Sequence, residues 1–319
     1  YRYRLNKLCS MSSLKLKDTN FFGYYDHTQW SDNMDFFILN VIKSNKLVLK
    51  IFEKKENEYI FKKDIISTPS FNYQQGIRAI WIDNNKIIFN YIYNNKMVSS
   101  IYNVRDQSLE YYPYPIQEIN KENMLFSIDY NKLSRLNPDY GYNLLEEGYS
   151  TIEIDGILGY DYINKNIKFI LKDSLIYEKS MNKILSSDCE INHISSCPDN
   201  KKIIFMYRNK NSDISSKLYL YDFNKNVLSC LFSGKIVSHY SWLNSNEIII
   251  YLGKDVKTQN YYILNINNKE LLPINKNINI NGDGHPSVSP DKRWLVYDSY
   301  PNRSRLIHLN LYNFRTNKI

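Results

Sequence analysis

The chain has 319 residues, a length that fits one large domain or two ordinary ones. Hydrophobic residues make up 43% and charged residues 23%, as in ordinary soluble globular proteins, and no apolar run is long enough for a membrane-spanning helix. The net charge of +8 is compatible with an acidic polysaccharide as partner, but no basic run is longer than a pair such as Lys201-Lys202, so we expect no nucleic acid.

Short runs of β-branched and aromatic residues follow one another along the chain, separated by Asn, Asp, Gly and Ser. This pattern predicts consecutive antiparallel strands, whereas helical periodicity is almost absent. The sequence therefore predicts an all-β protein. In chain order, the predicted strands cover residues 36–41, 46–52, 86–92, 202–207, 217–223, 247–252, 260–266, 293–298 and 306–312.

A segment of similar layout recurs at intervals of about 46 to 50 residues, beginning near positions 27, 77, 193, 239 and 285. Each copy has a polar start, a turn and an apolar strand, and all but the second start contain His. The period matches one four-stranded blade. We predict a β-propeller of six to seven four-stranded blades in a single domain over residues 1–319. The last blade lacks an obvious outer strand, and residues 1–16 complete a blade or belong to a seventh.

The wide gap between the repeats at 77 and 193 leaves room for one further blade and an insertion at about residues 127–150. This segment contains Pro, Gly and clustered Tyr, and is typical of a long ordered loop or a short helix. Long loops on a rigid scaffold often carry function, with a plain surface excursion as the alternative.

The first strand of each propeller blade lines the central channel, so the residues that open the repeats are expected to converge. Four of the five histidines stand at such starts, and imidazole is the usual proton carrier and metal ligand near neutral pH. These histidines point to a shared site, with repeated internal hydrogen bonding as the alternative. The opening residues are Tyr25, Asp26, His27, Gln74, Gln75, Arg78, Asn192, His193, Ser238, His239, Tyr240, Asp283, His285 and Ser287.

The four cysteines are too few for a disulfide framework in a chain of this length. Cys189, His193 and Cys197 lie close in sequence, but their spacing is not that of a zinc knuckle and no second ligand pair follows. We therefore assign no structural zinc. The sequence begins at Tyr1 and not at Met, so a leader could have been removed. We expect a soluble protein that is either cytoplasmic or exported after removal of a leader.

Six motifs follow one another between residues 21 and 304: FFGYYDHTQWS, FNYQQGIRAIW, SIDYNKLSRLNPDYGY, NHISSCPDNKKIIFMYR, VSHYSWLNSNEIII and NGDGHPSVSPDKRWLVYDSYP. In this order they resemble one bacterial family of seven-bladed propellers, which includes the ulvan lyases, a class of polysaccharide lyase. They resemble oligogalacturonate lyase and TolB-like propellers more distantly. The resemblance implies β-elimination on a uronate-containing anionic polysaccharide or oligosaccharide.

Such a reaction needs a base for the proton next to the carboxylate, a cation for the carboxylate and an acid at the leaving oxygen. By resemblance, the catalytic candidates are His193 as base, Tyr207 or Tyr240 as acid, Arg208 or Arg78 as carboxylate partner, and His239. The candidate substrate-binding residues are Tyr25, Gln75, Arg78, Arg135, Tyr140 and His285. The ulvan lyases use a pair of His together with a Tyr and an Arg. This chain departs from that pattern, because it has Gln75 rather than a second His in the QQG segment. The His-rich manganese cluster of oligogalacturonate lyase is not reproduced, so no metal ligands are assigned and a divalent metal stays open as cofactor.

Two other functions fit the same scaffold. One is a non-catalytic propeller that binds glycan or assists capsule or O-antigen biosynthesis. The other is a different glycan-active enzyme, for example a hydrolase that uses Asp26 and Asp283 as its two carboxylates. The absence of a Gly-rich nucleotide-binding loop weakens a nucleotide-sugar transferase of the usual kind. The oligomeric state is left open.

Overall fold

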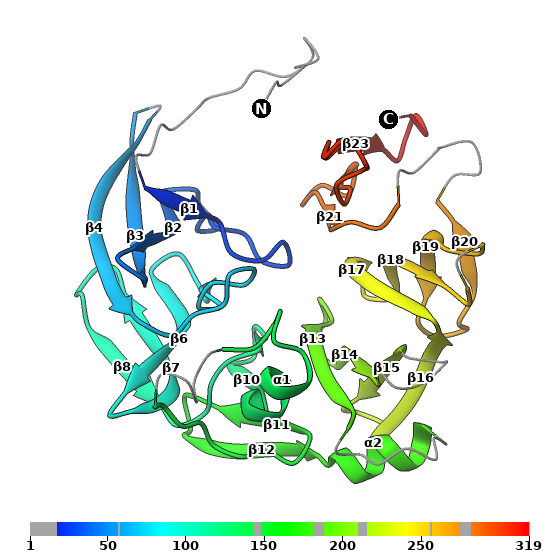
Figure 1. The fold of residues 1–319 in the computed structure, drawn as a ribbon, viewed down its shortest axis with the longest axis horizontal. Helices are drawn as coiled ribbons and strands as arrows, with labels where there is room; N and C mark the ends of the chain where they lie inside the picture. The colour runs from blue at the N-terminus through cyan, green and yellow to red at the C-terminus, as the bar shows by residue number, and fades with distance from the viewer. Residues whose placement is uncertain are drawn as a thin grey trace.

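The computed structural model describes residues 18–56, 58–142, 148–180, 188–209, 216–255, 257–274 and 282–318. Within these residues the strands form six antiparallel sheets, which follow one another in chain order around a common centre (Figure 1). The protein is therefore an all-β, six-bladed β-propeller, which confirms the predicted fold class. A seventh blade is not found in the described part of the chain. No helix there is both long and apolar enough to cross a membrane.

Each of the first five blades consists of four strands that are neighbours in sequence and pair in up-and-down order. Blade 1 contains β1 (Thr19–Phe21), β2 (Phe36–Lys43), β3 (Lys46–Lys55) and β4 (Glu58–Thr68). Blade 2 contains β5 (Ile80–Trp81), β6 (Lys86–Tyr93), β7 (Lys96–Asn103) and β8 (Leu109–Tyr112). Blade 3 contains β9 (Glu118–Ile119), β10 (Met124–Ile128), β11 (Ile157–Asp161) and β12 (Asn166–Leu171).

Blade 4 contains β13 (Glu190–Ser196), β14 (Lys202–Arg208), β15 (Ser216–Asp222) and β16 (Val227–Gly234). Blade 5 contains β17 (Ile236–Asn244), β18 (Glu247–Gly253), β19 (Asn260–Asn265) and β20 (Leu271–Pro273). Blade 6 has only three strands, as the sequence predicts: β21 (Ser287–Val288), β22 (Trp294–Asp298) and β23 (Leu309–Asn313). The strand expected from residues 1–16 lies outside the described residues.

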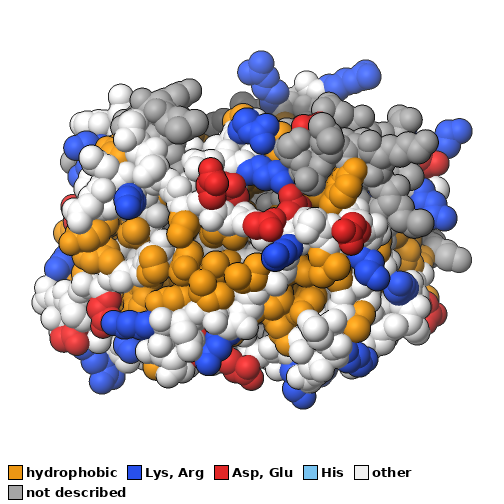
Figure 2. Space-filling model, turned by 90° about the horizontal axis from the view of Figure 1, so that it is seen from below, with side chains coloured by type: hydrophobic (Ala, Val, Ile, Leu, Met, Phe, Trp, Pro, Cys, Tyr) orange, Lys and Arg blue, Asp and Glu red, His pale blue; other side chains and the backbone are white. Residues whose placement is uncertain are grey.

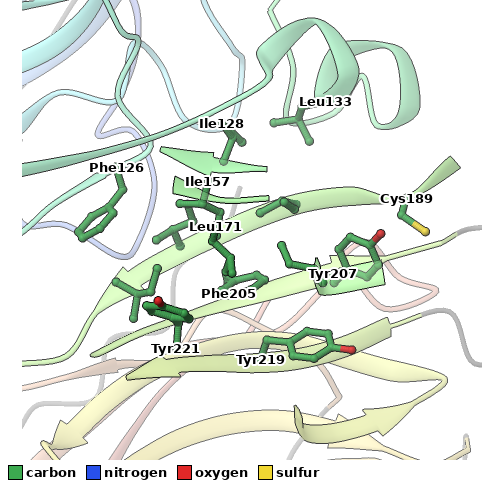
Figure 3. Close-up of a cluster of buried hydrophobic side chains, with 14 of the residues drawn as sticks. Phe126, Ile128, Leu133, Ile157, Leu171, Cys189, Phe205, Tyr207, Tyr219 and Tyr221 are labelled. Atoms are coloured by element: carbon green, nitrogen blue, oxygen red, sulfur yellow. The ribbon is translucent and has the colours of Figure 1, made fainter. Parts of the chain in front are cut away.

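Strand β14 shows why the sequence pattern contains apolar runs rather than a simple alternation. Successive side chains of a strand point to opposite faces, and both faces of this blade are covered by neighbouring blades. Ile203, Phe205 and Tyr207 pack toward blade 3, where Figure 3 shows Phe205 and Tyr207 among the buried side chains. Ile204 and Met206 pack toward blade 5. Burial on both faces therefore requires the continuous run that the sequence contains.

Two short helices interrupt the strands around blade 3. Helix α1 (Tyr130–Leu136) lies between β10 and β11, within the segment expected to be inserted, of which residues 143–147 lie outside the described part. It begins after Asp129, whose carboxylate accepts the backbone N–H of Lys132 at 3.0 Å. Helix α2 (Asp173–Ser180) follows β12. Its apolar side chains are hardly segregated to one face, so the sequence carries no helical signal there.

The outer side of the ring near β12 and α2 is partly apolar (Figure 2). Ile167 and Ile170 of β12 and Leu175 of α2 are exposed there. Acidic side chains also gather around a hollow on this side (Figure 2). These features lie at the circumference of the ring, outside blade 3.

The loop between β1 and β2 extends to the centre of the ring (Figure 1). From this loop, Tyr24 and Tyr25 contact histidines of blades 5 and 6. The ring centroids of Tyr24 and His239 are 6.0 Å apart, and those of Tyr25 and His285 are 5.1 Å apart. The Tyr25 hydroxyl also donates to the backbone carbonyl of Tyr240 at 3.1 Å. Blade 1 thereby reaches the far side of the ring through a single loop.

Candidate functional site

Three histidines from three successive blades lie together at the centre of the propeller. The ring centroids of His193 and His239 are 5.7 Å apart, and those of His239 and His285 are 4.1 Å apart. Tyr24 contacts all three rings and stacks on His193 at 5.5 Å. His193 and His239 are buried, whereas the side chain of His285 is 24% exposed. We define these three imidazoles as the histidine cluster.

Irregularities in the inner strands place two of these histidines. The pairing of β13 with β14 is interrupted between Asn192 and Ser195, and His193 in that gap has a φ of +52°. The pairing of β17 with β18 is interrupted between Val237 and Tyr240, which brackets His239. Bulges of this kind redirect side chains and are common next to active sites. The bulges therefore account for the direction of both rings toward the centre.

Hydrogen bonds at Nδ1 fix the tautomer of His239. Its Nδ1 lies 3.1 Å from the carbonyl oxygen of Gly284, which can only accept, so Nδ1 carries the proton. Ser238 Oγ is 3.0 Å from the same nitrogen and donates to Asp283 Oδ2 at 2.5 Å. In the neutral ring, Nε2 is then the acceptor. The Nε2 atoms of both His193 and His239 are buried without a hydrogen-bond partner in the structure.

Two rings of the histidine cluster, His193 and His239, are held neutral by their surroundings. Burial, and then the positive charge of Arg208, lower the pKa of His193 well below its ordinary value. Burial also lowers the pKa of His239, although the carboxylate of Asp283, whose Oδ1 lies 3.7 Å from Nδ1, opposes the shift. At neutral pH both rings are therefore uncharged and each offers a lone pair.

Stability should fall in mild acid because of these two shifts. Unfolding returns the pKa values of His193 and His239 to about 6.5, so below that pH the unfolded chain binds more protons than the folded chain. We expect the free energy of unfolding to fall by up to about 1.4 kcal/mol per pH unit for each ring as the pH drops from 6.5 toward the folded-state pKa. Urea titrations at several pH values measure this slope.

The variant His193→Gln should reduce that slope, and His308→Gln, at an exposed histidine, should leave it unchanged. His27 contributes with the opposite sign: burial lowers its pKa, but Glu118 and Asp26 outweigh burial and raise it. Its stabilisation is lost as the pH rises through the folded-state value. An unaltered slope in His193→Gln would contradict a neutral buried imidazole at this position.

Arg208, at the end of β14, supplies the positive charge beside the cluster. Its guanidinium donates to the carbonyl of Val237 at 3.1 Å and contacts the sulfur of Met206 at 2.8 Å. Its charge lowers the pKa of both His193 and His239, which places the guanidinium on the side of the cluster. Arg208 is only partly buried, so it combines a fixed position with access to solvent.

Arg78 has a different environment, because it is bound within the protein. Its Nη1 donates to both carboxylate oxygens of Asp26, at 3.1 and 2.8 Å, and its Nη2 donates to the carbonyl of Gln117 at 2.5 Å. Its side chain is 1% exposed. Beside this pair, Nε2 of His27 lies 3.6 Å from Oε2 of Glu118. These charges join blades 1, 2 and 3, and the structure does not offer Arg78 to a ligand at the histidine cluster.

The two tyrosines predicted as acids lie in different surroundings. Tyr207 lies in the apolar interface between blades 3 and 4 (Figure 3), where burial, followed by Asp173, raises its pKa. The Tyr240 hydroxyl donates to the backbone carbonyl of His193, and burial raises its pKa well above the ordinary value. The structure therefore does not bring Tyr207 to the cluster, and it gives the Tyr240 hydroxyl a backbone partner.

The other predicted binding residues divide into two groups. Tyr25 and Tyr140 border the cluster, since the ring of Tyr140 is 4.8 Å from that of His193. Gln75 is buried on the Asp26 side, where it lines a small cavity with Arg78, and its amide has no hydrogen-bond partner in the structure. Arg135 is exposed in the last turn of α1. The hydrolase alternative has no visible carboxylate pair, because Asp26 binds Arg78 and Asp283 accepts from Ser238.

No metal site is apparent in the described ranges: they contain no group of three or more His, Cys, Asp or Glu residues that could hold an ion. Cys197 donates to the carbonyl of Ser245 at 3.5 Å, and Cys189 accepts from Asn209 at 3.4 Å. The two thiols therefore do not join His193 in one ligand set. Within the described ranges, the Nε2 atoms of His193 and His239 have no hydrogen-bond partner, and an imidazole nitrogen of this kind is a common metal ligand.

A larger cavity, of about 400 Å³, lies away from the histidine cluster. It is formed between α1, the start of α2 and β13, and its lining includes Lys132, which forms an ion pair with Asp173 at 2.5 Å. None of the predicted site residues lines it. Its carboxylate-rich wall is unsuited to an anionic sugar. The full lining is Ile128, Asp129, Lys132, Leu133, Glu153, Ile154, Asp155, Gly156, Asp173, Glu190 and Ile191.

Two residues of the site were not singled out from the sequence. Tyr24 precedes the predicted Tyr25, and only the structure shows which of the two rings stacks on His193. Asp298 ends β22 and accepts from His285, at 3.0 Å from Nδ1 to each carboxylate oxygen. The single available signal was an acidic residue at the end of a predicted strand in the same repeat.

Comparison with known proteins supports the fold and no narrower assignment. No protein-family model matches the chain, and no curated protein matches it in sequence. TolB from Acinetobacter baumannii is similar in structure, with 15% identity and a TM-score of 0.50, over 84% of this chain and 57% of TolB. This chain thus spans less than two thirds of that protein.

Two further solved structures are similar at comparable levels. A chain of the mitotic checkpoint complex gives 11% identity and a TM-score of 0.54, over 99% of this chain and 86% of that one. Oligogalacturonate lyase in complex with manganese gives 10% identity and a TM-score of 0.45, over 92% and 89%. At these identities the similarity shows the propeller fold alone. These comparisons support a β-propeller and assign no family, and the resemblance to ulvan lyases stays a prediction.

Proposed function

We propose that this propeller is a polysaccharide lyase that cleaves a uronate-containing anionic polymer by β-elimination. The observation that carries the proposal is the histidine cluster beside the partly exposed guanidinium of Arg208, in which His193 and His239 are neutral and their Nε2 atoms have no hydrogen-bond partner. Elimination requires a proton acceptor next to a fixed positive charge, and this site combines the two.

Each participant has a role that follows from its chemistry. Arg208 would bind the uronate carboxylate with its planar guanidinium and so stabilise the negative charge that develops when the adjacent C–H bond breaks. An imidazole of the cluster would take the proton. Tyr25 and Tyr140, at the edge of the cluster, would pack against the sugar ring, since Tyr offers an apolar face together with a polar hydroxyl.

The test is a panel of uronate-containing polymers incubated with the purified protein. Elimination leaves a C=C double bond conjugated with the carboxylate, so the expected result is a new ultraviolet absorbance together with shorter chains by size analysis. Neutral polymers without carboxylates serve as controls and should stay intact. Retention of the anionic polymers without any unsaturated product would overturn the lyase and favour the non-catalytic glycan-binding alternative.

A further inference from the structure

We propose that His285 and Asp298 form the acid–base dyad of the site, with His285 as the catalytic residue and Asp298 as its positioning residue. This inference rests on the proposed function and assigns the proton transfer within it. Among the three imidazoles of the cluster, His285 is the one with substantial exposure, at 24% of its side chain. It is also the one whose ring nitrogen contacts a carboxylate at hydrogen-bond distance.

The backbone register produces this contact. Ser287 of β21 pairs with Val296 of β22, and continuing the antiparallel register by two residues places His285 opposite Asp298. The His285 backbone N–H donates to Asp298 Oδ1 at 2.6 Å, and Nδ1 lies 3.0 Å from each carboxylate oxygen. Main chain and side chain thus hold the same carboxylate.

Gly284 allows the approach. A Cβ at this position would lie 1.9 Å from the carbonyl oxygen and 2.8 Å from Oδ1 of Asp298, closer than real side chains come. The Gly284 carbonyl also accepts Nδ1–H of His239 at 3.1 Å. One glycine therefore orients both rings, whose centroids are 4.1 Å apart.

The carboxylate decides which nitrogen of His285 is available. An ionised carboxylate accepts only, so Nδ1 carries the proton and Nε2 offers its lone pair. The pKa of Asp298 supports ionisation, because its hydrogen bonds with His285 outweigh burial and lower that pKa. Orientation of an imidazole by a carboxylate at Nδ1 is the arrangement that activates a general base.

The proposed step balances with this single imidazole. His285 Nε2 takes the proton bound to the carbon next to the uronate carboxylate, and the electrons of that C–H bond form the C=C bond. The bond from the neighbouring carbon to the glycosidic oxygen breaks, and the imidazolium returns its proton to that oxygen. Asp298 stabilises the imidazolium between the two transfers. His193 and His239, which are buried and held neutral, would provide the uncharged wall behind the sugar.

The experiment compares the wild-type protein with Asp298→Asn and Asp298→Glu. We expect Asp298→Asn to lower kcat by about 10²- to 10⁴-fold with little change in KM, because an amide no longer enforces the tautomer. Asp298→Glu should recover part of the activity. Asp291→Asn is the matched control, since this exposed aspartate pairs with Arg293 away from the cluster, and it should keep full activity.

A second readout needs no substrate. Nitrogen-15 NMR of the histidine rings reports the tautomer, and we expect Nδ1–H for His285 in the wild-type protein and a shift toward Nε2–H in Asp298→Asn. A wild-type His285 protonated at Nε2 would overturn the dyad, even where the variants fail to fold. Product formation that persists in Asp298→Asn would also overturn it and leave the lyase standing. If no polymer yields product while the tautomer behaves as expected, the proposed function falls and the positioning of His285 by Asp298 is upheld.

Discussion

Replacing Arg208 by Ala should lower kcat/KM on a cleavable uronate polymer by about 10²- to 10³-fold, the usual effect of removing one fixed group that stabilises developing charge. The guanidinium is held by the carbonyl of Val237 at 3.1 Å and is positioned before substrate arrives. Arg208→Lys should recover little, because an ammonium cannot bind the carboxylate with two parallel hydrogen bonds. The rate of ultraviolet absorbance increase measures the effect.

Methyl esterification of the polymer provides a matched test of the same contact. Esterified substrate lacks the negative charge that Arg208 would bind, so the wild-type protein should lose activity on it by a similar factor. In Arg208→Ala, esterification should cost little more, because the two changes remove the same interaction. Arg293→Ala, at an exposed arginine that pairs with Asp291, should behave as wild type. Independent, additive losses from the two changes would place the carboxylate elsewhere.

Replacing Arg78 by Met should destabilise the fold by about 3–5 kcal/mol, since it leaves a largely buried carboxylate without its partner. Asp26 would lose two hydrogen bonds and the Gln117 carbonyl would lose its donor. Denaturant titration measures the change in the free energy of unfolding. Arg293→Met is the control: it removes an exposed pair with Asp291 and should leave the free energy of unfolding nearly unchanged.

The double variant Asp26→Asn with Arg78→Met distinguishes two causes of destabilisation: the unpaired charge of Asp26 and the lost packing of the Arg78 side chain. With the carboxylate removed as well, the destabilisation should be smaller than in Arg78→Met alone. Equal destabilisation of the single and double variants would mean that the aliphatic part of Arg78 carries the effect. That result would contradict an electrostatic role for this residue.

The fold could be predicted because it follows from local patterns that each blade repeats. The run of β14 is apolar because both of its faces are covered. Of the recurring His positions, His193 and His239 lie within inner strands and His285 lies just before one, whereas His27 lies in the loop between β1 and β2. Helix α2 could not be predicted, because its apolar residues do not follow a helical face. Residue propensity and hydrophobic periodicity indicate which side chains of one segment are buried. Helix α2 instead links blade 3 to blade 4, and this position is not encoded in its own pattern.

The site could be predicted less completely, because side-chain direction depends on strand register. His193, His239 and His285 were expected to converge, and the structure brings their rings together. Arg78 was expected to meet substrate, but its pairing with Asp26 depends on a loop from another blade. The role of Asp298 depends on the alignment of β21 with β22, which no repeat pattern reports.

The way in which blade 1 meets blade 6 has a thermodynamic consequence. In the described part of the chain no strand pair joins these two blades, and the contacts there include those of Tyr24 and Tyr25 with His285. The residues that join the ends of the ring are thus the residues that border the histidine cluster. A ligand that contacts both blade 1 and blade 6 would hold the two ends of the ring together. Its free energy of binding would then add to the free energy required to open the ring.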